Sequence, residues 1–462
     1  MDQTIKDLIK QIMASDRITR LVFRVSAVMI VAAVGPLTAS SEVPTFADTI
    51  GGNASLQSCV RYALVHQPSV NKSLLDEEIV DRAISSRIAD WYPQLSFNAY
   101  IQHDPQIPVS VAGGTPIPTT LANSSGGLLT LTQTLFNRDV LLASSTASDV
   151  RRSMEQQTVE NKIDVVASVS KAFYAVLVTQ QQLAVLDDDI LRLQRSLQDA
   201  FDEYKGGVVD KTDYKRATIS LNNARAERRE TEELLKARYT DLRNQMGYPP
   251  DAKLKLSADV SQMEREAFLD TTQNVRYEKR VEYRLLETQK RLQEANLSYA
   301  EWGFLPSLSF IGNYTVSYMN AGYPDLYRSR YASSFVGLQL SLPILEGGKR
   351  WQEIKEARLE LDRYDYEFMA LKNSVNAEFV NAMANYKSDL NNYRVLKENV
   401  ALAEEVFETI QLQYKAGTKT YLELITAETD LRSAQINHTN ALYEVLSSKL
   451  DVQKALGTLP YE

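Results

Sequence analysis

Two stretches of this 462-residue chain, residues 128–205 and residues 349–416, contain neither glycine nor proline. Runs of this length without a helix breaker are rare outside long helices. Apolar residues in both stretches recur at alternating spacings of three and four, which is typical of a coiled-coil seam. The seam positions are Leu183, Leu186, Ile190, Leu193, Leu197, Ala200 and Tyr204, then Tyr393, Leu396, Val400, Ala403, Phe407, Ile410 and Tyr414. We therefore expect long helices at about residues 138–205 and 347–416, each about 100 Å long.

The two seams coincide under a shift of 210 residues. The same shift aligns YKGGVVDKTDYKRATISLNNAR, in the first half, with YKAGTKTYLELITAETDLRSAQ, in the second. Self-similarity at a fixed spacing indicates a repeated structural unit. The sequence therefore predicts two tandem repeats, residues 48–250 and 251–462, and in each the long helix reverses at a glycine turn that needs a tight backbone. The turn glycines are Gly206, Gly207 and Gly417.

Each half also carries two strand-like segments ahead of its long helix. Pro93 and Pro306 both open the motif Pro-x-Leu-Ser-Phe, where proline ends an incoming helix and an alternating pattern begins. The β-hairpins are expected at about residues 93–136 and 305–345, with returning strands at 127–136 and 335–345 and a polar loop at 104–125. Incoming helices are expected at 56–90 and 272–301, outgoing helices at 212–246 and 421–456, and a polar connector at about 249–274.

The N-terminus has the pattern of an export signal. Arg17, Arg20 and Arg24 precede an apolar run over residues 25–37, and small residues in Thr-Phe-Ala suit cleavage after Ala47. A membrane anchor is the alternative, but this run is interrupted by Gly-Pro and is shorter than the roughly 20 residues needed to span a bilayer. We therefore predict a signal peptide at residues 1–47 and no spanning helix after it.

Composition argues against several functional classes. A formal net charge of -8 argues against a nucleic-acid partner. The single cysteine, Cys59, cannot form an internal disulfide and is expected to be a small buried apolar residue, and three scattered histidines match no metal-ligand spacing. There is no phosphate-binding loop, and no serine has the nucleophile-elbow motif or a plausible histidine partner. The sequence predicts no cofactor, no metal and no enzymatic activity.

The four expected strands raise a topological question. At ten to fourteen residues they are long enough to cross a bilayer when tilted, but four strands cannot close a barrel, and open edges in lipid leave backbone groups unpaired at several kcal/mol each. Trp91, Tyr92, Trp302 and Phe304 stand at strand ends, as in an interfacial aromatic girdle. Several chains would therefore have to pool their strands. The alternative is an ordinary soluble β-layer.

These segments resemble one known family, the TolC-like outer-membrane efflux and secretion ducts. The resemblance runs from LQSCVRYALVHQPSV, residues 56–70, to ALGTLP, residues 455–460, and is most specific at YKAGTKTYLELITAET. It implies an α+β membrane protein that forms a homotrimer, with a 12-stranded barrel in the outer membrane of a Gram-negative bacterium and a 12-helix tunnel across the periplasm. It also implies a passive exit duct for small molecules or exported proteins, docked to a periplasmic adaptor and an inner-membrane pump of the RND, ABC or MFS type.

In this family a network of hydrogen bonds and charges ties the inner helix pair to the outer pair at the periplasmic mouth. The matching positions here are Thr212, Asp213, Tyr414, Lys419 and Glu423. Lys419 stands where an arginine is common, and Thr426 stands where a second acidic residue can occur, so the resemblance implies one acidic ring at most. The alternative for Lys419 and Glu423 is a pair of solvated helix-end charges.

A second functional class also fits part of the sequence. An exported coiled-coil scaffold without a pore would explain the seams and the repeat. It would not explain two hairpins with aromatic ends at the same point of both halves. We therefore favour the duct.

Overall fold

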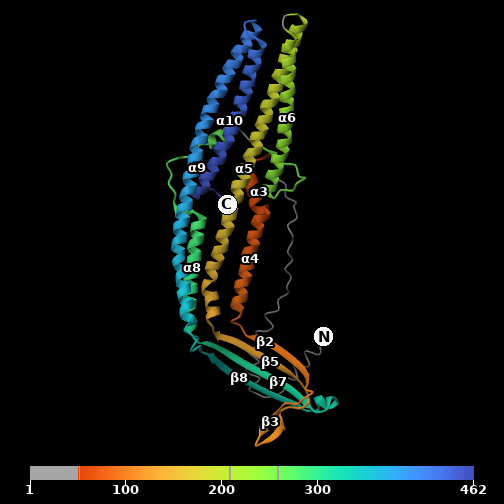
Figure 1. Ribbon diagram of the computed structural model, residues 1–462, viewed down its shortest axis with the longest axis vertical. Helices are drawn as coiled ribbons and strands as arrows, with labels where there is room; N and C mark the ends of the chain where they lie inside the picture. Colours follow the sequence, from red (N-terminus) through yellow and green to blue (C-terminus); the bar gives the residue numbers. More distant parts are fainter. Residues whose placement is uncertain (1–49, 51–52, 208–209, 258–259, 462) are drawn as a thin grey trace. The chain divides into compact units, whose positions relative to one another are not determined.

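Helices make up most of the described chain, and four long strands form its main sheet (Figure 1). The structure, a computed structural model, describes residues 50, 53–207, 210–257 and 260–461. The expected signal peptide, residues 1–47, lies outside these residues.

Two long helices are the largest elements. Helix α5 spans Arg138–Lys205 and α9 spans Lys349–Lys415, close to the ranges that the sequence predicts. Each is followed by a shorter helix, α6 at Lys211–Met246 and α10 at Tyr421–Leu456. Helix α5 packs along α6, α9 packs along α10, and the two pairs meet through α5 and α10. The paired helices thus form two hairpins that meet at one interface.

Residues of the predicted seams lie in these contacts. Leu186, Leu193 and Ala200 of α5 are buried, as are Tyr393 and Phe407 of α9. One stretch of α5 is apolar enough to cross a membrane by length and composition, but 67% of that stretch is buried inside the protein. It therefore has the features of a core helix.

The main sheet has the strand order β2-β5-β7-β8, and every neighbouring pair is antiparallel. Its strands are β2 at Gln94–His103, β5 at Asn123–Phe136, β7 at Ser307–Asn320 and β8 at Arg330–Ser341. The two hairpins of the separate halves are therefore joined into one sheet by the pairing of β5 with β7 (Figure 1). Within the described residues, β2 and β8 each have one unpaired edge.

The register places unlike residues on the two faces of this sheet, because side chains alternate along a strand. One face is mainly apolar and carries Leu95, Phe97, Ile101, Leu129, Leu131, Phe310, Tyr314, Val316, Val336, Leu338 and Leu340. The opposite face is mainly polar and carries Gln94, Ser96, Asn98, Thr130, Thr132, Asn313, Thr315, Ser333 and Gln339. Among the described residues no α-helix packs on the apolar face, and Phe97 and Leu338 are each 68% exposed. At one end of this face, Tyr327 of the short 3-10 helix between β7 and β8 packs edge-on against Tyr318.

Some predicted boundaries are wrong. Strands β5 and β8 begin at Asn123 and Arg330, earlier than predicted, and β8 ends at Ser341 because Pro343 beyond it has no N–H for a ladder. The polar loop predicted at 104–125 contains a small hairpin, β3 at Val109–Ala112 and β4 at Thr115–Pro118. Its turn is Gly113-Gly114, with φ of +60° and +82°, as a two-residue hairpin turn requires.

The incoming helices also differ from the prediction. The first is two helices, α3 at Leu56–His66 and α4 at Pro68–Ala89. Gln67 between them is extended, since a following proline disfavours the helical conformation. The second, α8, spans Val281–Glu301 and so begins later than residue 272. Short 3-10 helices precede and follow it, η1 at Tyr277–Lys279 and η2 at Trp302–Phe304, and a third, η3 at Tyr323–Arg328, lies between β7 and β8.

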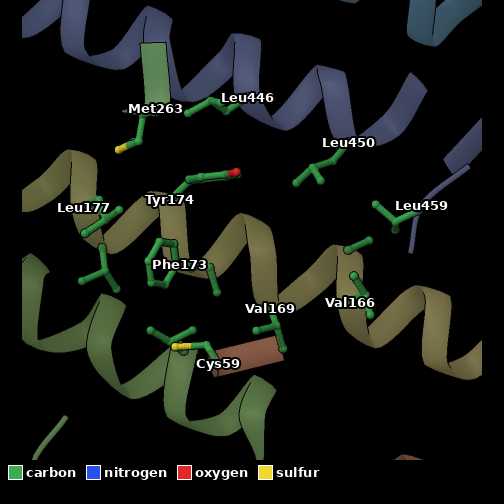
Figure 2. Close-up of a cluster of buried hydrophobic side chains, with 14 of the residues drawn as sticks. Cys59, Val166, Val169, Phe173, Tyr174, Leu177, Met263, Leu446, Leu450 and Leu459 are labelled. Carbon is green, nitrogen blue, oxygen red and sulfur yellow. The ribbon is translucent and has the colours of Figure 1, made fainter. Parts of the chain in front are cut away.

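The segment predicted as a polar connector takes part in the core. Its strand β6, Lys255–Leu256, pairs in parallel with β1, Asn53–Ala54, and its helix α7 spans Val260–Glu266. Met263 of α7 packs in one buried cluster with Cys59, Phe173 and Leu446 (Figure 2). Cys59 is buried, as expected, and burial raises the pKa of its thiol to about 12. This core joins α3, α4, α5, α6, α7, α9 and α10.

Candidate functional site at the two helix tips

Each helix hairpin reverses at a glycine in the left-handed conformation. Gly207, between α5 and α6, has φ of +72°, and Gly417, between α9 and α10, has φ of +73°. An added Cβ would meet no atom within 4 Å at either position, so the backbone angle and not packing requires glycine there. Gly206 ends α5 with φ of -73°, as Ala416 ends α9 with φ of -82°. Of the predicted turn glycines, Gly206 is thus the one whose backbone does not require glycine.

Hydrogen bonds close the second tip on both sides. At the end of α9, Thr418 N–H donates to Gln413 O and Gly417 N–H donates to Tyr414 O, both at 2.9 Å, which is the Schellman arrangement. At the start of α10, Thr420 and Glu423 form a reciprocal capping box. The turn is therefore short and hydrogen-bonded at both of its ends.

Glu423 has partners on both carboxylate oxygens. Lys419 Nζ donates to Oε1 at 2.6 Å, and the backbone N–H and hydroxyl of Thr420 donate to Oε2 at 2.9 and 3.0 Å. The Lys419 ammonium, followed by the Thr420 donors, lowers the pKa of Glu423 to about 2. Glu423 is therefore ionised at any pH near neutrality, and its charge is already paired within its own chain.

Tyr414 connects the two tips. Its hydroxyl donates to Glu203 Oε2 at 2.7 Å, which joins α9 to α5, and its ring packs edge-on against Tyr421 of α10, with centroids 5.9 Å apart. Burial and then the Glu203 carboxylate raise the pKa of Tyr414, so the hydroxyl stays protonated and can donate. Sequence reasoning missed Glu203. The only available signal was that Glu203 is an acidic residue directly before Tyr204, which aligns with Tyr414 under the shift of 210 residues.

At the first tip, the turn between α5 and α6, the predicted residues are Thr212 and Asp213. Asp210 caps α6, and it accepts from the Thr212 N–H at 3.0 Å and from the Thr212 hydroxyl at 3.2 Å. Thr212 is therefore occupied within its own turn. Asp213 lies close enough for its charge to contribute to the raised pKa values of Tyr414 and Tyr421, but the structure gives no hydrogen bond between Asp213 and Tyr414. The predicted gate residues thus do not form one network in the described chain: Thr212 and the Lys419–Glu423 pair are bonded locally, and Tyr414 bonds to Glu203 across the hairpins.

An apolar cluster lies directly behind the tips. Helices α5, α6, α9 and α10 all contribute to it. Its buried members are Ala200, Ala217, Phe407, Tyr421, Leu424, Ala427 and Leu431. Thr426, beside this cluster, donates to Leu422 O within its own helix. Among the described residues, no group of three or more His, Cys, Asp or Glu side chains is placed to hold a metal ion. The chemistry of the tips is therefore that of hydrogen bonds, fixed charges and packing.

Comparison with known proteins identifies the family of this chain. The model of the family described as "Outer membrane efflux protein" matches residues 60–248 and 284–458. The chain belongs to the outer membrane efflux protein family. It is 24% identical over 428 residues to Outer membrane protein TolC of Salmonella enteritidis, which covers 89% of this chain and 83% of that protein. It is also 24% identical over 317 residues to Proteases secretion protein PrtF of Dickeya chrysanthemi, over 66% of each.

A solved structure shows the same fold. The outer membrane protein VceC of Vibrio cholerae superposes with a TM-score of 0.68 at 15% identity, over 88% of this chain and 97% of that one. The family resemblance stated from the sequence is therefore confirmed. As a member of this family, the chain is an outer-membrane channel of the efflux or type I secretion kind, and the comparisons do not favour a scaffold without a pore.

Proposed function

We propose that this outer membrane efflux protein is a homotrimeric, passive exit duct. Three copies of its four-stranded sheet would close one 12-stranded barrel in the outer membrane, and its helix hairpins would form a 12-helix tunnel across the periplasm. The observation that carries this proposal is the sheet itself, with one apolar face, one polar face and two unpaired edges.

The edges favour closure by pairing between copies. Neighbouring strands in the sheet alternate in direction, so β8 of one copy runs antiparallel to β2 of the next when the sheets are placed in a ring. Closure would satisfy the backbone groups that an open edge leaves unpaired in lipid at several kcal/mol each. The apolar face would then meet lipid and the polar face would line the pore.

Aromatic side chains at the junction of sheet and helices support a membrane boundary there. Trp91, Tyr92, Phe304 and Trp351 are all exposed in the single chain. Trp and Tyr are enriched where a barrel meets the headgroup layer, because one end of each ring system is apolar and the other polar. The outer-membrane lipid interface would therefore lie at this level, with the helices on the periplasmic side.

The tips would form the periplasmic mouth. Two repeats, residues 48–250 and 251–462, in each of three chains would place six helix turns around one aperture, where a periplasmic adaptor and an inner-membrane pump of the RND, ABC or MFS type would dock. The Tyr414–Glu203 hydrogen bond would hold the two hairpins of a chain together, and Glu423 would contribute an acidic ring. Pump and adaptor would select and drive the substrate, so the duct needs no catalytic group or cofactor of its own.

Fractionation and crosslinking test this proposal. Membranes are washed with high salt and then with urea, and the protein is extracted with mild detergent and treated with a lysine-reactive crosslinker. We expect release by detergent alone and a trimer as the terminal crosslinked species. Release by salt or urea would favour the exported coiled-coil scaffold, and a stable monomer that inserts into bilayers would exclude the shared barrel.

A further inference from the structure

A group of charged side chains is buried where the two helix hairpins meet, next to the apolar cluster behind the tips. Asp189 of α5 is 0% exposed and Glu428 of α10 is 2% exposed. Arg192 of α5 and Arg432 of α10 lie between them, and Glu227 of α6 lies at the margin. Carboxylates are almost never buried to this degree without full pairing. This group therefore needs a physical explanation.

The hydrogen bonds in this group are distributed unequally. Asp189 accepts from Arg192 Nη2 at 3.3 Å and from Arg432 Nη1 at 3.1 Å, one on each oxygen. Glu428 has only the Arg192 Nε atom at 3.7 Å, which is too long for a hydrogen bond, and neither of its oxygens has a hydrogen-bond partner within the described chain. Asp189 therefore takes the donors of both guanidinium groups.

The charges around Glu428 come from three helices. Helix α5 supplies Asp189 and Arg192, α6 supplies Glu227, and α10 supplies Arg432 and the buried hydroxyl of Tyr421. Helix α9 supplies the Phe407 ring, 6.0 Å from the Arg192 guanidinium, which is a neutral surface. With Glu428 ionised, three carboxylates face two guanidinium groups. With Glu428 protonated, the charges balance.

Protonation of Glu428 is therefore favoured by its surroundings. Burial and then the Asp189 charge raise the pKa of Glu428 to about 7, and the two arginines offset this only in part. A carboxyl in water keeps its ordinary pKa near 4.5. Any motion that exposed Glu428 to water would thus be coupled to loss of its proton.

Other ion pairs between α5 and α10 are partly exposed to water. Lys171 pairs with Asp451 at 2.7 Å and Lys454 pairs with Asp164 at 2.6 Å, and these side chains are at least one-third exposed. Asp189 and Glu428 differ from these pairs because they are buried at the same interface.

We propose that Glu428 is a proton-operated lock on the tunnel mouth, which holds the α5/α6 hairpin against α10 when neutral and releases it when ionised. This inference rests on the proposed duct, because a lock has a function only if the hairpins separate to open a passage. It adds a second closure behind the Tyr414–Glu203 contact at the tips.

The direction of the pH effect follows from the raised pKa. The closed state binds a proton on Glu428 more tightly than the open state does, so closure is fully favoured below about pH 4.5. This preference is lost as the pH rises from about 4.5 to about 7. The closed-to-open ratio is expected to fall by roughly 10- to 100-fold across that interval.

Conductance measurements test the lock. Purified protein in planar bilayers is titrated from pH 5 to pH 8, and its resting conductance is compared with that of Glu428→Gln, which is always neutral and nearly isosteric. We expect wild-type conductance to rise several-fold toward pH 7.5 and Glu428→Gln to stay at its low acid value. Glu444→Gln, an exposed carboxyl change on the same helix, should follow wild type. A wild-type pH profile in Glu428→Gln would overturn the proposal.

A second variant tests the same point from the opposite side. Asp189→Asn frees both guanidinium groups to pair with Glu428 and should move the midpoint of the pH response to lower pH by about one unit or more. An unchanged midpoint in this variant would also contradict the lock.

A structural readout separates the lock from the duct. Spin labels at Lys215→Cys and Lys415→Cys, both exposed lysines near the two tips, are measured in a Cys59→Ser background at pH 5 and pH 7.5. We expect longer label distances at pH 7.5, and no change when Glu428→Gln is added. Distances that respond to pH through Glu428 in a protein without conductance would reject the duct and leave Glu428 as the group that controls hairpin separation. If neither the conductance nor the label distances depend on Glu428, the lock is rejected and the duct is kept.

Discussion

Tyr414 and Glu423 occupy the same tip but have different kinds of partner. Tyr414 reaches across to Glu203 on the other hairpin, whereas Glu423 is satisfied by Lys419 and Thr420 beside it. A contact across the hairpins resists their separation, and a contact within one turn stabilises only that turn. Under the proposed function, Tyr414 should therefore control opening and Glu423 should control which ions pass.

Tyr414→Phe should enlarge the resting conductance. It removes one hydrogen bond between the tips, worth about 0.5 to 1.5 kcal/mol net, so the open fraction should increase roughly 2- to 10-fold. Single-channel recording of purified protein measures this. Tyr421→Phe is the matched control, because that hydroxyl is buried without a hydrogen-bond partner in the described chain. Equal conductance in both variants would show that the Glu203 contact does not hold the mouth.

Glu423→Gln should weaken cation preference without loosening the mouth. Glutamine can still close the capping box, so helix α10 keeps its start while the proposed ring loses its charge. The cation-to-anion permeability ratio, from reversal potentials, should fall about twofold or more. Because its pKa is lowered, the charge of Glu423 is present above about pH 4.5 and is lost only as the pH falls toward 2. A wild-type ratio that changes between pH 5 and pH 8 would point to another residue.

Single residues also show where sequence reasoning reaches its limit. Gly207 and Gly417 could be predicted, because a left-handed turn after a long helix has a strong local signature. Glu203 could not, since nothing near it in the sequence indicates that Tyr414 lies beside it. Thr212 was assigned to the gate through the resemblance, but Asp210 two residues away competes for its donors.

The helices and strands differ in how well the sequence predicts them. Helices α5 and α10 have nearly the predicted ends, because helix breakers and caps are local features. Strand starts were wrong because strand length depends on the partner: β5 extends back to Asn123, which pairs with Asn320 in the other half of the chain. The connector was judged polar by composition, but a few apolar side chains such as Leu254 and Met263 are enough to bury it.

Leu193→Asp should damage the seam of α5 severely. Leu193 is 2% exposed and packs with Leu221 and Ala224 of α6, so aspartate there would place an unpaired charge among apolar groups. The cost should be about 3 kcal/mol or more, seen as lower trimer yield and a lower urea midpoint. Leu191→Asp, two residues away and 54% exposed, is the control and should cost far less. Similar losses in both variants would mean that α5 presents a different face to α6.

A single chain does not account for the complete assembly. A sheet with an apolar face and two open edges is stable neither in water nor in lipid when left alone. Family membership establishes an outer-membrane channel, and the proposed trimer makes the sheet complete. The separation of apolar and polar faces could be predicted from alternation within β7, but the single continuous sheet could not, because the β5–β7 pairing joins residues nearly 200 positions apart.

The central claim, that β8 of one copy pairs with β2 of the next, can be tested by engineered disulfides in a Cys59→Ser background. Ser96→Cys in β2 is combined in turn with Ser333→Cys, Gly337→Cys or Gln339→Cys in β8, which samples the unknown register between copies. Ser96→Cys with Thr315→Cys in β7 is the control, because β5 separates those strands. After oxidation in the membrane, we predict a covalent trimer on denaturing gels for at least one β2–β8 pair and none for the control. Complete oxidation that leaves only single chains or dimers in every β2–β8 pair would contradict the shared barrel.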